Sequence, residues 1–263
     1  MSNKVFSAIQ KKGQRVLNVY FTAGHPTLSS IPTIVEGLQE GGADLIELGM
    51  PYSDPLADGT TIQQSSAAAL HNGMNLKYLF EQVKISTSNN DIPIILMGYY
   101  NQILQFGVER FLDLAAENGV SGMIIPDLPM FEYENLYQTM FEERNLGISF
   151  LISPMTSEDR IQQAGRLSSA FLYMVSQSSI TGKTNEITQS QKDYFTRVDQ
   201  MDIKSPRLIG FGIYDKTTFD TACQYSSGAI VGSSFIRALE QDASKKGIIN
   251  FVKSMHWDTS RPM

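Results

Sequence analysis

The carboxylates of one short segment are the side chains of this sequence best suited to acid–base chemistry. Glu47 lies inside the hydrophobic run 45–48, and a loop rich in Pro, Gly and Asp follows it with Asp54 and Asp58. Because an unpaired carboxylate is costly to bury, a chain that places one in a buried strand is expected to use it. A carboxyl group whose pKa is raised by a dry site can both donate and accept a proton near neutral pH. We therefore predict that Glu47 is a catalytic acid or base.

Each acidic residue also has a structural explanation. Glu47 could pair with a basic side chain inside the fold, but no Arg or Lys lies in the first six predicted strands. Asp58 lies in a loop, where Asp is common for turn formation alone, so both explanations stay open for it. Asp54 and Asp127 each adjoin a proline, which favours a role in shaping their loops, and a second role stays open for Asp54. No Lys lies at a strand end in the apolar setting that imine chemistry needs, which favours proton transfer.

Eight short apolar runs are the predicted strands that position these residues. The runs are mostly continuous rather than alternating, which is typical of parallel strands covered by helices. They are Val16–Phe21, Asp44–Leu48, Ile92–Met97, Gly122–Ile125, Ile148–Ile152, Phe171–Val175, Arg207–Gly210 and Ala229–Val231.

Stretches with helical spacing of apolar residues lie between the strands. They are Ser29–Glu40, Leu76–Ile85, Gly107–Glu117, Glu132–Arg144, Ser157–Leu167, Thr217–Gln224 and Phe235–Glu240. Alternation of strand and helix about eight times in roughly 250 residues predicts an α/β fold, a (β/α)₈ TIM barrel. An open doubly wound sheet is the alternative, but it often carries GxGxxG after its first strand, and Thr22–Pro26 is no such motif.

Two further helices are expected at the ends of the chain. Asn3–Lys12 would cover the bottom of the barrel, and Ala243–Met255 would form a terminal helix. No linker or shift of composition divides the sequence, which predicts a single TIM-barrel domain over residues 1–263. The longest irregular segments, Pro51–Ala67 and Gln177–Gln191, are predicted to be functional loops.

The loops after the last three strands are rich in Gly, Ser and Thr. Backbone N–H groups of such loops, together with a helix N-terminus, often hold a phosphate in barrels. These glycines could instead serve only to form tight turns. Two pairs of glycines around adjacent strands favour a phosphate-binding site over that explanation. Aromatic side chains at strand ends would suit a flat aromatic substrate, although core packing is the default explanation of each alone. These aromatics are Phe21, Tyr99, Tyr173 and Phe211.

Composition narrows the function classes. The chain has 263 residues, 42% of them hydrophobic, and a net charge of −6. The negative charge argues against a nucleic-acid-binding protein, which needs a basic surface. No apolar run approaches the length of a membrane span, and no secretory pattern opens the sequence. One cysteine, Cys223, excludes an intramolecular disulfide, and the three histidines lack metal-ligand spacing. We expect a cytoplasmic protein without a metal, with Cys223 as a buried structural thiol.

The motif 45–63, LIELGMPYSDPLADGTTIQ, resembles the defining motif of the tryptophan synthase α subunit family. Further motifs match in order, so that the resemblance covers the chain from about Phe6 to Leu239. They are Phe21–Gly24, Met97–Asn101, Pro126–Pro129, Ser179–Gly182, Gly210–Ile213 and Gly232–Ser234. The resemblance implies a barrel that cleaves indole-3-glycerol phosphate to indole and glyceraldehyde 3-phosphate.

The resemblance also implies a partner and a role for each matching residue. The partner is a β subunit carrying pyridoxal phosphate, in an α₂β₂ complex, that takes indole through a tunnel; no cofactor is expected in this chain. Glu47 would move a proton at indole C3, and Asp58 would hold the indole N–H. The expected substrate-binding residues are Phe21, Met97, Tyr99, Ile124, Tyr173, Thr181 and Phe211. The expected phosphate-binding residues are Gly182, Gly212, Ile213, Gly232 and Ser233.

The chain departs from the family pattern at a few positions. Thr60 replaces a usual proline, His25 a common Asp, and Ser65–Ala67 a stretch that usually carries Asn and Arg. None removes a catalytic group, but the last bears on loop ordering and signalling to the β subunit. Two alternatives remain: a catalytically weak barrel that acts mainly as an allosteric partner, and a barrel lyase that releases free indole without a partner.

Overall fold

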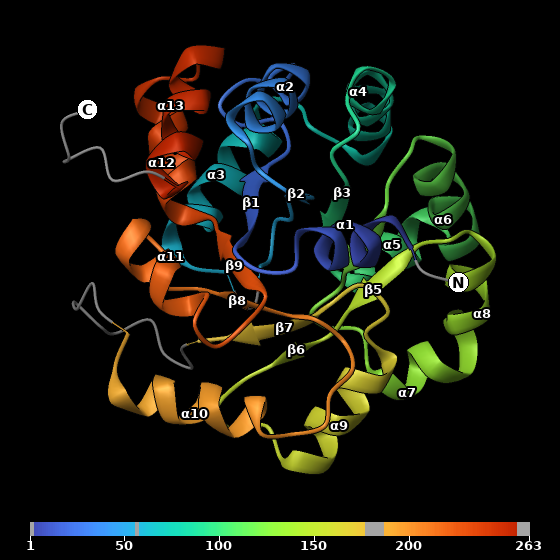
Figure 1. Cartoon of the computed structure of the whole chain (residues 1–263). Coiled ribbons are helices and arrows are strands. Elements are labelled where there is room, and N and C mark those ends of the chain that lie inside the picture. Colours follow the sequence, from blue (N-terminus) through green and yellow to red (C-terminus); the bar gives the residue numbers. More distant parts are fainter. Residues whose placement is uncertain (1–2, 56–57, 177–186, 257–263) are drawn as a thin grey trace, which may run out of the picture.

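A computed structural model describes residues 3–55, 58–176 and 187–256, in which nine parallel β segments form a barrel wall (Figure 1). Their order is β5-β4-β3-β2-β1-β9-β8-β7-β6. Because only Phe150 separates β5 from β6, the two are halves of one strand and the barrel closes with eight. The segments are β1 Val16–Thr22, β2 Leu45–Gly49, β3 Ile94–Met97, β4 Gly122–Ile124, β5 Gly147–Ser149, β6 Leu151–Ile152, β7 Leu172–Val175, β8 Arg207–Gly210 and β9 Gly228–Val231.

The predicted fold class is confirmed, with one correction in the fifth strand. The continuous strand expected over Ile148–Ile152 is interrupted at Phe150, whose N–H donates to the Ser168 hydroxyl at 3.0 Å instead of to a neighbouring strand. The Phe150 carbonyl still accepts from the Tyr173 N–H at 3.0 Å, so the wall remains joined across the interruption.

Helices surround the barrel on its outer face (Figure 1). Their bounds are α1 Lys4–Lys12, α2 Ile31–Gly41, α3 Thr60–His71, α4 Leu76–Asn89, α5 Tyr100–Phe106, α6 Val108–Glu117, α7 Met130–Glu132, α8 Gln138–Glu143, α9 Glu158–Leu167, α10 Gln189–Asp199, α11 Lys216–Ala222, α12 Ser233–Gln241 and α13 Lys245–His256, with a π-helical turn, η1, at Tyr133–Tyr137.

Three helices lie where the sequence pattern predicts none. Helix α3 begins at Thr60, inside the segment 51–67 that was expected to be irregular, and α5 and α10 were also not predicted. The buried face of α3 consists of Ser65, Ser66 and Ala69. Because small and polar residues form that face, the hydrophobic periodicity that reveals other helices is missing.

Side chains on each strand alternate between two buried layers. In β1, Val16 and Tyr20 belong to the cluster inside the barrel, whereas Leu17, Val19 and Phe21 belong to the cluster between barrel and helices. Both faces of the wall are therefore dry, which explains why the strands read as continuous apolar runs.

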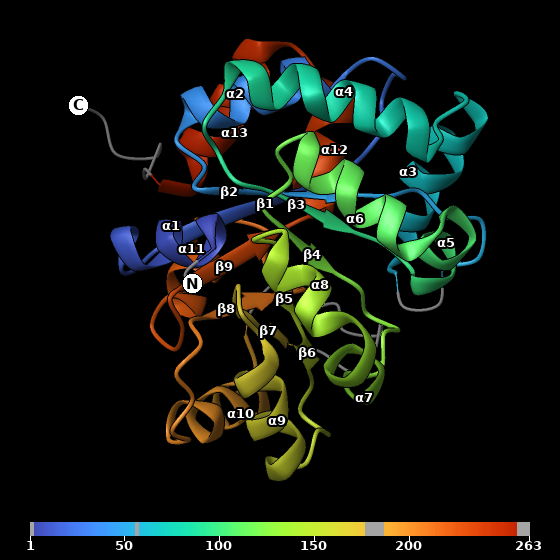
Figure 2. The same ribbon diagram turned by 90° about the vertical axis from the view of Figure 1, so that its right-hand side faces the viewer.

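Helix α1 closes the amino-terminal end of the barrel, as the sequence predicts. Val5 and Ile9 are buried in the inner cluster. The Asn3 side chain caps the helix by accepting from the Phe6 N–H at 2.9 Å, and its amide donates to the Ser169 carbonyl at 2.7 Å. Figure 2 shows α1 at one end of the barrel and α5 and α7 at the other.

The predicted terminal helix is also present, as α13, and it packs on α2. Gly37 and Gly41 of α2 permit this approach, because a Cβ at either would lie within 2.8 Å of Ile248 or Val252. No helix among the described residues is long and apolar enough to cross a membrane.

Shortening Ile9 to Ala is expected to lower the free energy of unfolding by about 2–4 kcal/mol, because it leaves a cavity in the inner core. Urea denaturation measures the change. The matched control is Gln10→Ala, at the next residue of the same helix, which is exposed. Its free energy of unfolding is expected to stay within about 0.5 kcal/mol of the wild-type value. Equal effects of the two changes would show that α1 is not part of the core.

Candidate active site

Glu47 lies on the inner face of the barrel wall. It belongs to β2, is 1% exposed, and pairs in register with Tyr20 of β1. The Asn18 amide donates to its Oε2 at 3.1 Å. Burial raises the pKa of Glu47 to about 8; the Asn18 hydrogen bond lowers it, and the Asp58 charge raises it further. A carboxyl group with such a pKa exchanges a proton near neutral pH.

Asp58 is held over the same region by the loop that follows β2. The Tyr99 hydroxyl, at the end of β3, donates to its Oδ2 at 3.2 Å, and the Gln63 amide donates to its carbonyl at 2.8 Å. The Tyr52 and Tyr99 rings lie 5.1 Å apart and further join the two loops. Burial raises the pKa of Asp58, and the Tyr99 hydrogen bond lowers it.

Two tyrosines inside the barrel complete this group. The charges of Glu47 and Asp58 act on both Tyr20 and Tyr173, whose pKa values are raised first by burial and then by those charges. Neighbouring strands make room for both rings with glycine: a Cβ at Gly49 would lie 2.2 Å from the Tyr20 hydroxyl. The tyrosines therefore crowd the inner wall beside the two carboxyl groups.

The structure corrects the predicted role of Phe21. Its side chain lies in the outer cluster, where its ring makes an edge contact with Phe235 of α12 at 6.4 Å. Because successive residues of a strand face opposite sides, Tyr20 takes the inward position instead. Alternation of Asn18, Tyr20 and Thr22 across β1 was the signal that could have found it.

Three other predicted lining residues lie in or beside the cluster inside the barrel. Ile124 belongs to the inner cluster, and Met97 and Phe211 pack against it. The Phe211 ring lies 6.2 Å from that of Tyr173. Thr181 and Gly182 lie outside the described residues.

Of the predicted phosphate-binding residues, the four that the structure describes follow β8 and β9 directly. Phe211 and Gly212 both have positive φ, at 64° and 74°, an unusual conformation for a phenylalanine. The Ser176 hydroxyl donates to the Phe211 carbonyl and holds this turn. Ile213 is buried beside it.

Gly232 and Ser233 open helix α12. Gly232 is its N-cap, and no side chain caps the helix by a hydrogen bond. The adjacent Ser234 hydroxyl, absent from the predicted set, is buried without a partner among the described residues. Free N–H groups and a hydroxyl at a helix N-terminus are suited to an anion.

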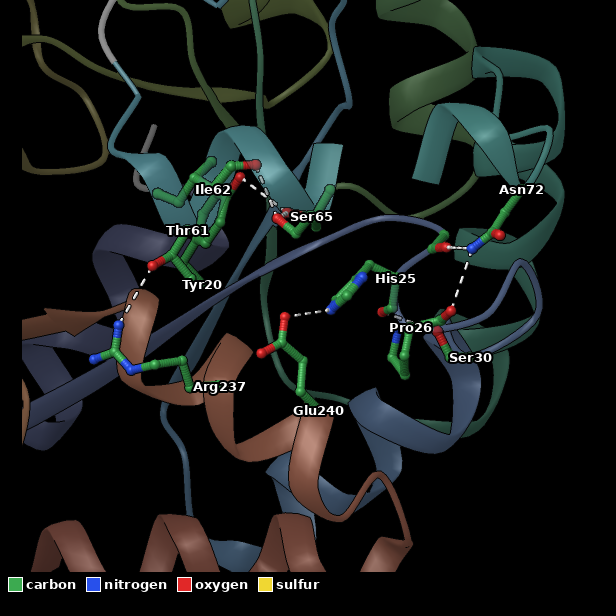
Figure 3. A network of polar contacts seen from close by, with 12 residues as sticks. Tyr20, His25, Pro26, Ser30, Thr61, Ile62, Ser65, Asn72, Arg237 and Glu240 are labelled. Carbon is green, nitrogen blue, oxygen red and sulfur yellow. Dashed lines mark hydrogen bonds and ion pairs between the residues drawn. The ribbon is translucent and has the colours of Figure 1, made fainter. Parts of the chain in front are cut away.

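A polar network links α3 to the loop after β1 and to α12 (Figure 3). Within the interior, the Thr22 and Ser65 hydroxyls lie 2.6 Å apart, so the unusual Ser65 joins α3 to β1. Arg237 of α12 contacts the Thr61 hydroxyl at 3.4 Å.

His25, another residue that departs from the family pattern, faces α12 in the same network. Its Nε2 lies 3.7 Å from Glu240 Oε1 (Figure 3), and burial lowers the pKa of the ring. Helix α3 is therefore joined to α12 directly through Thr61 and Arg237, and indirectly through the loop that carries His25.

The site combines a buried carboxyl group with a raised pKa, a second carboxyl group on a loop, aromatic walls and a helix N-terminus. Among the described residues no group of His, Cys, Asp or Glu could hold a metal ion. The single cysteine, Cys223, directly follows α11. Burial raises the pKa of its thiol to about 11, so it is not suited to act as a nucleophile. The arrangement suits proton transfer on an aromatic substrate that carries a phosphate.

Comparisons of the sequence and of the structure with known proteins identify the same family. A family model described as tryptophan synthase alpha chain matches residues 6–257. The tryptophan synthase alpha chain of Flavobacterium psychrophilum is 46% identical over 240 residues, which cover 91% of this chain and 94% of the relative. A solved tryptophan synthase from Mycobacterium tuberculosis has a TM-score of 0.85 at 27% identity and covers 97% of both chains. A tryptophan synthase complex from Pyrococcus furiosus gives 0.83 at 31% identity, with 92% of this chain and 97% of that chain covered.

Replacing Glu47 by Gln is expected to change the pH dependence of stability. Because burial raises the pKa of Glu47 from 4.5 to about 8, the native state keeps a proton that the unfolded chain releases above pH 4.5. This group therefore lowers the free energy of unfolding as pH rises between these two values. Urea denaturation should find Glu47→Gln more stable than the wild type at about pH 8.5, and the difference should shrink toward about pH 5. A difference that does not vary with pH would contradict the raised pKa.

Proposed function

The chain belongs to the tryptophan synthase alpha chain family, and we propose that it is the carbon–carbon lyase of the α reaction, cleaving indole-3-glycerol phosphate to indole and glyceraldehyde 3-phosphate. The observation that carries this proposal is the pair of carboxyl groups at the carboxyl end of β2. One is fixed inside the barrel wall, and the other lies on the loop above it.

Glu47 is the proposed proton carrier. Cleavage breaks the bond between indole C3 and the hydroxyl-bearing carbon of the glycerol chain. C3 must gain a proton, and the hydroxyl must lose one as its carbon becomes the aldehyde. One carboxyl group balances both steps if it gives its proton to C3 and takes up the hydroxyl proton. The raised pKa of Glu47, about 8, supports this double use.

Asp58 is the proposed partner of the indole nitrogen. Protonation at C3 leaves positive charge on the ring, which spreads to the nitrogen. A carboxylate that accepts from the N–H stabilises this charge, more strongly where water is excluded. The Tyr99 hydrogen bond lowers the pKa of Asp58 and so favours the ionised form that this role needs.

The remaining predicted residues would hold the two ends of the substrate. Met97, Ile124 and Phe211 adjoin the inner cluster and suit a flat ring, with Tyr20 in the place first predicted for Phe21. Tyr173 would lie near the glycerol hydroxyls. Backbone N–H groups of the turns at 212–213 and 232–233 would bind the phosphate, with Gly182 and Thr181 as further predicted contacts.

We also propose that this chain binds a tryptophan synthase β subunit, in an α₂β₂ complex, and passes indole to it. Large apolar side chains are exposed on segments that follow β3, β4 and β6, at the same end of the barrel as the site: Leu104, Phe131 at 70% and Met155 at 84% exposed. A hollow of about 300 Å³ lined by Pro126, Leu128 and Phe150, among others, lies between the latter two segments. Exposed apolar groups around a hollow are typical of protein interfaces.

The other properties proposed for this chain follow from the family. Pyridoxal phosphate is expected in the β subunit and not here, which fits proton chemistry carried by Glu47 alone. A cytoplasmic location is in keeping with the acidic composition and the single cysteine.

Glu47→Gln is expected to lower indole formation from indole-3-glycerol phosphate by about 10²–10⁴-fold, because it removes the proton carrier. Asp58→Asn should also lower kcat strongly. Indole release is measured with and without β subunit, which also tests whether the isolated chain is active. Glu81→Gln changes an exposed carboxyl of α4 and should leave the rate unchanged. Near-normal turnover by Glu47→Gln would refute the assignment.

Phe131→Asp is expected to weaken binding of the β subunit at least about tenfold, since it places a charge on the proposed apolar face. Isothermal titration with the β chain of the same organism measures the Kd. Ile85→Asp, at an exposed apolar position on α4, is the matched control. Equal affinity of both variants would place the interface elsewhere.

A further inference from the structure

Asn18 is a buried polar residue that the predicted mechanism does not use. It lies on β1, is 0% exposed, and precedes Tyr20 by one inward position. Its Nδ2 donates to Glu47 Oε2 at 3.1 Å, and both atoms are buried. Since β1 and β2 are adjacent strands in fixed register, the amide and the carboxyl are held together by backbone pairing on both sides.

The other end of the Asn18 side chain argues against a purely structural role. Its Oδ1 is buried and has no hydrogen-bond partner among the described residues. A buried carbonyl without a partner destabilises a fold, so a leucine of similar size would suit this interior better. The contact with Glu47 is the interaction that compensates for the buried amide.

The groups around Glu47 determine how much the Asn18 hydrogen bond matters for its ionisation. Asp58 faces it from the loop after β2, Tyr20 from β1 and Tyr173 from β7. None of these carries positive charge, and Asp58 opposes ionisation of Glu47. Among the described residues, Asn18 is thus the neighbour whose hydrogen bond favours the ionised carboxyl.

We propose that Asn18 is a positioning residue for Glu47. Its amide fixes Oε2 against the barrel wall, which leaves Oε1 to exchange the proton with substrate. It also stabilises the ionised form, so that the carboxyl releases its proton readily enough to turn over. This inference rests on the proposed function for its catalytic consequence, but not for its effect on the ionisation of Glu47.

The test is an Asn18→Leu variant, with two readouts. Infrared spectroscopy follows the protonated carboxyl band of Glu47, identified as the band that Glu47→Gln lacks. Loss of the hydrogen bond disfavours the charged form, so the midpoint of this band is expected to rise by about one pH unit. In the assay, the limb of the pH profile of kcat/KM that reports Glu47 should move the same way. At neutral pH kcat should fall about tenfold, with KM within about twofold.

Ser149→Ala is the matched control, because the Ser149 hydroxyl is also buried without a partner among the described residues. It should move neither the band nor the profile. If Asn18→Leu does not fold, Asn18→Val removes the same amide with a residue that suits a strand.

The outcomes separate the two proposals. An unchanged band midpoint and pH profile in a folded Asn18 variant would overturn the role of Asn18, as would an equal shift in Ser149→Ala. A wild-type protein that forms no indole, with or without β subunit, would refute the lyase assignment. The infrared midpoint would then still decide whether Asn18 controls the ionisation of Glu47.

Discussion

The burial of one carboxyl group, without a cation near it in the described structure, is the constraint on which this site depends. Glu47 lies in a wall that is dry on both faces, so its charged form is disfavoured and its pKa rises to about 8. A salt bridge would remove that effect, because an adjacent cation would hold the carboxyl ionised. The (β/α)₈ scaffold maintains the dry interior, with helix α1 closing the end opposite the site.

The surroundings of Glu47 are built from neutral polar groups and close packing. Asn18 supplies a hydrogen bond from the neighbouring strand, and the tyrosine rings fill the space beside it. Gly49 and Gly210 are needed there, because a Cβ at either would overlap the hydroxyl of Tyr20 or Tyr173. The interior around Glu47 is therefore closely packed and nearly free of other charges.

The second carboxylate differs because it lies on a loop. Asp58 is tied to Tyr99, and the helix that follows its loop is joined to β1 through Ser65 and Thr22 and to α12 through Thr61 and Arg237. These contacts connect the two proposed substrate ends, the indole nitrogen and the phosphate. Ser65 and His25, which depart from the family pattern, take part in that connection.

Local hydrophobic pattern was sufficient to predict the eight strands, most of the helices with an apolar face and the presence of Glu47 in a buried wall. The pattern missed α10, although Tyr194, Phe195 and Val198 form a buried apolar face on that helix. It could not reveal α3, whose buried face is serine and alanine, nor that Tyr20 rather than Phe21 faces inward. Only the tertiary structure placed Asn18 against Glu47 and Tyr99 against Asp58. These pairs join different strands and loops, and their meeting depends on strand register and barrel closure, which no local stretch of sequence specifies.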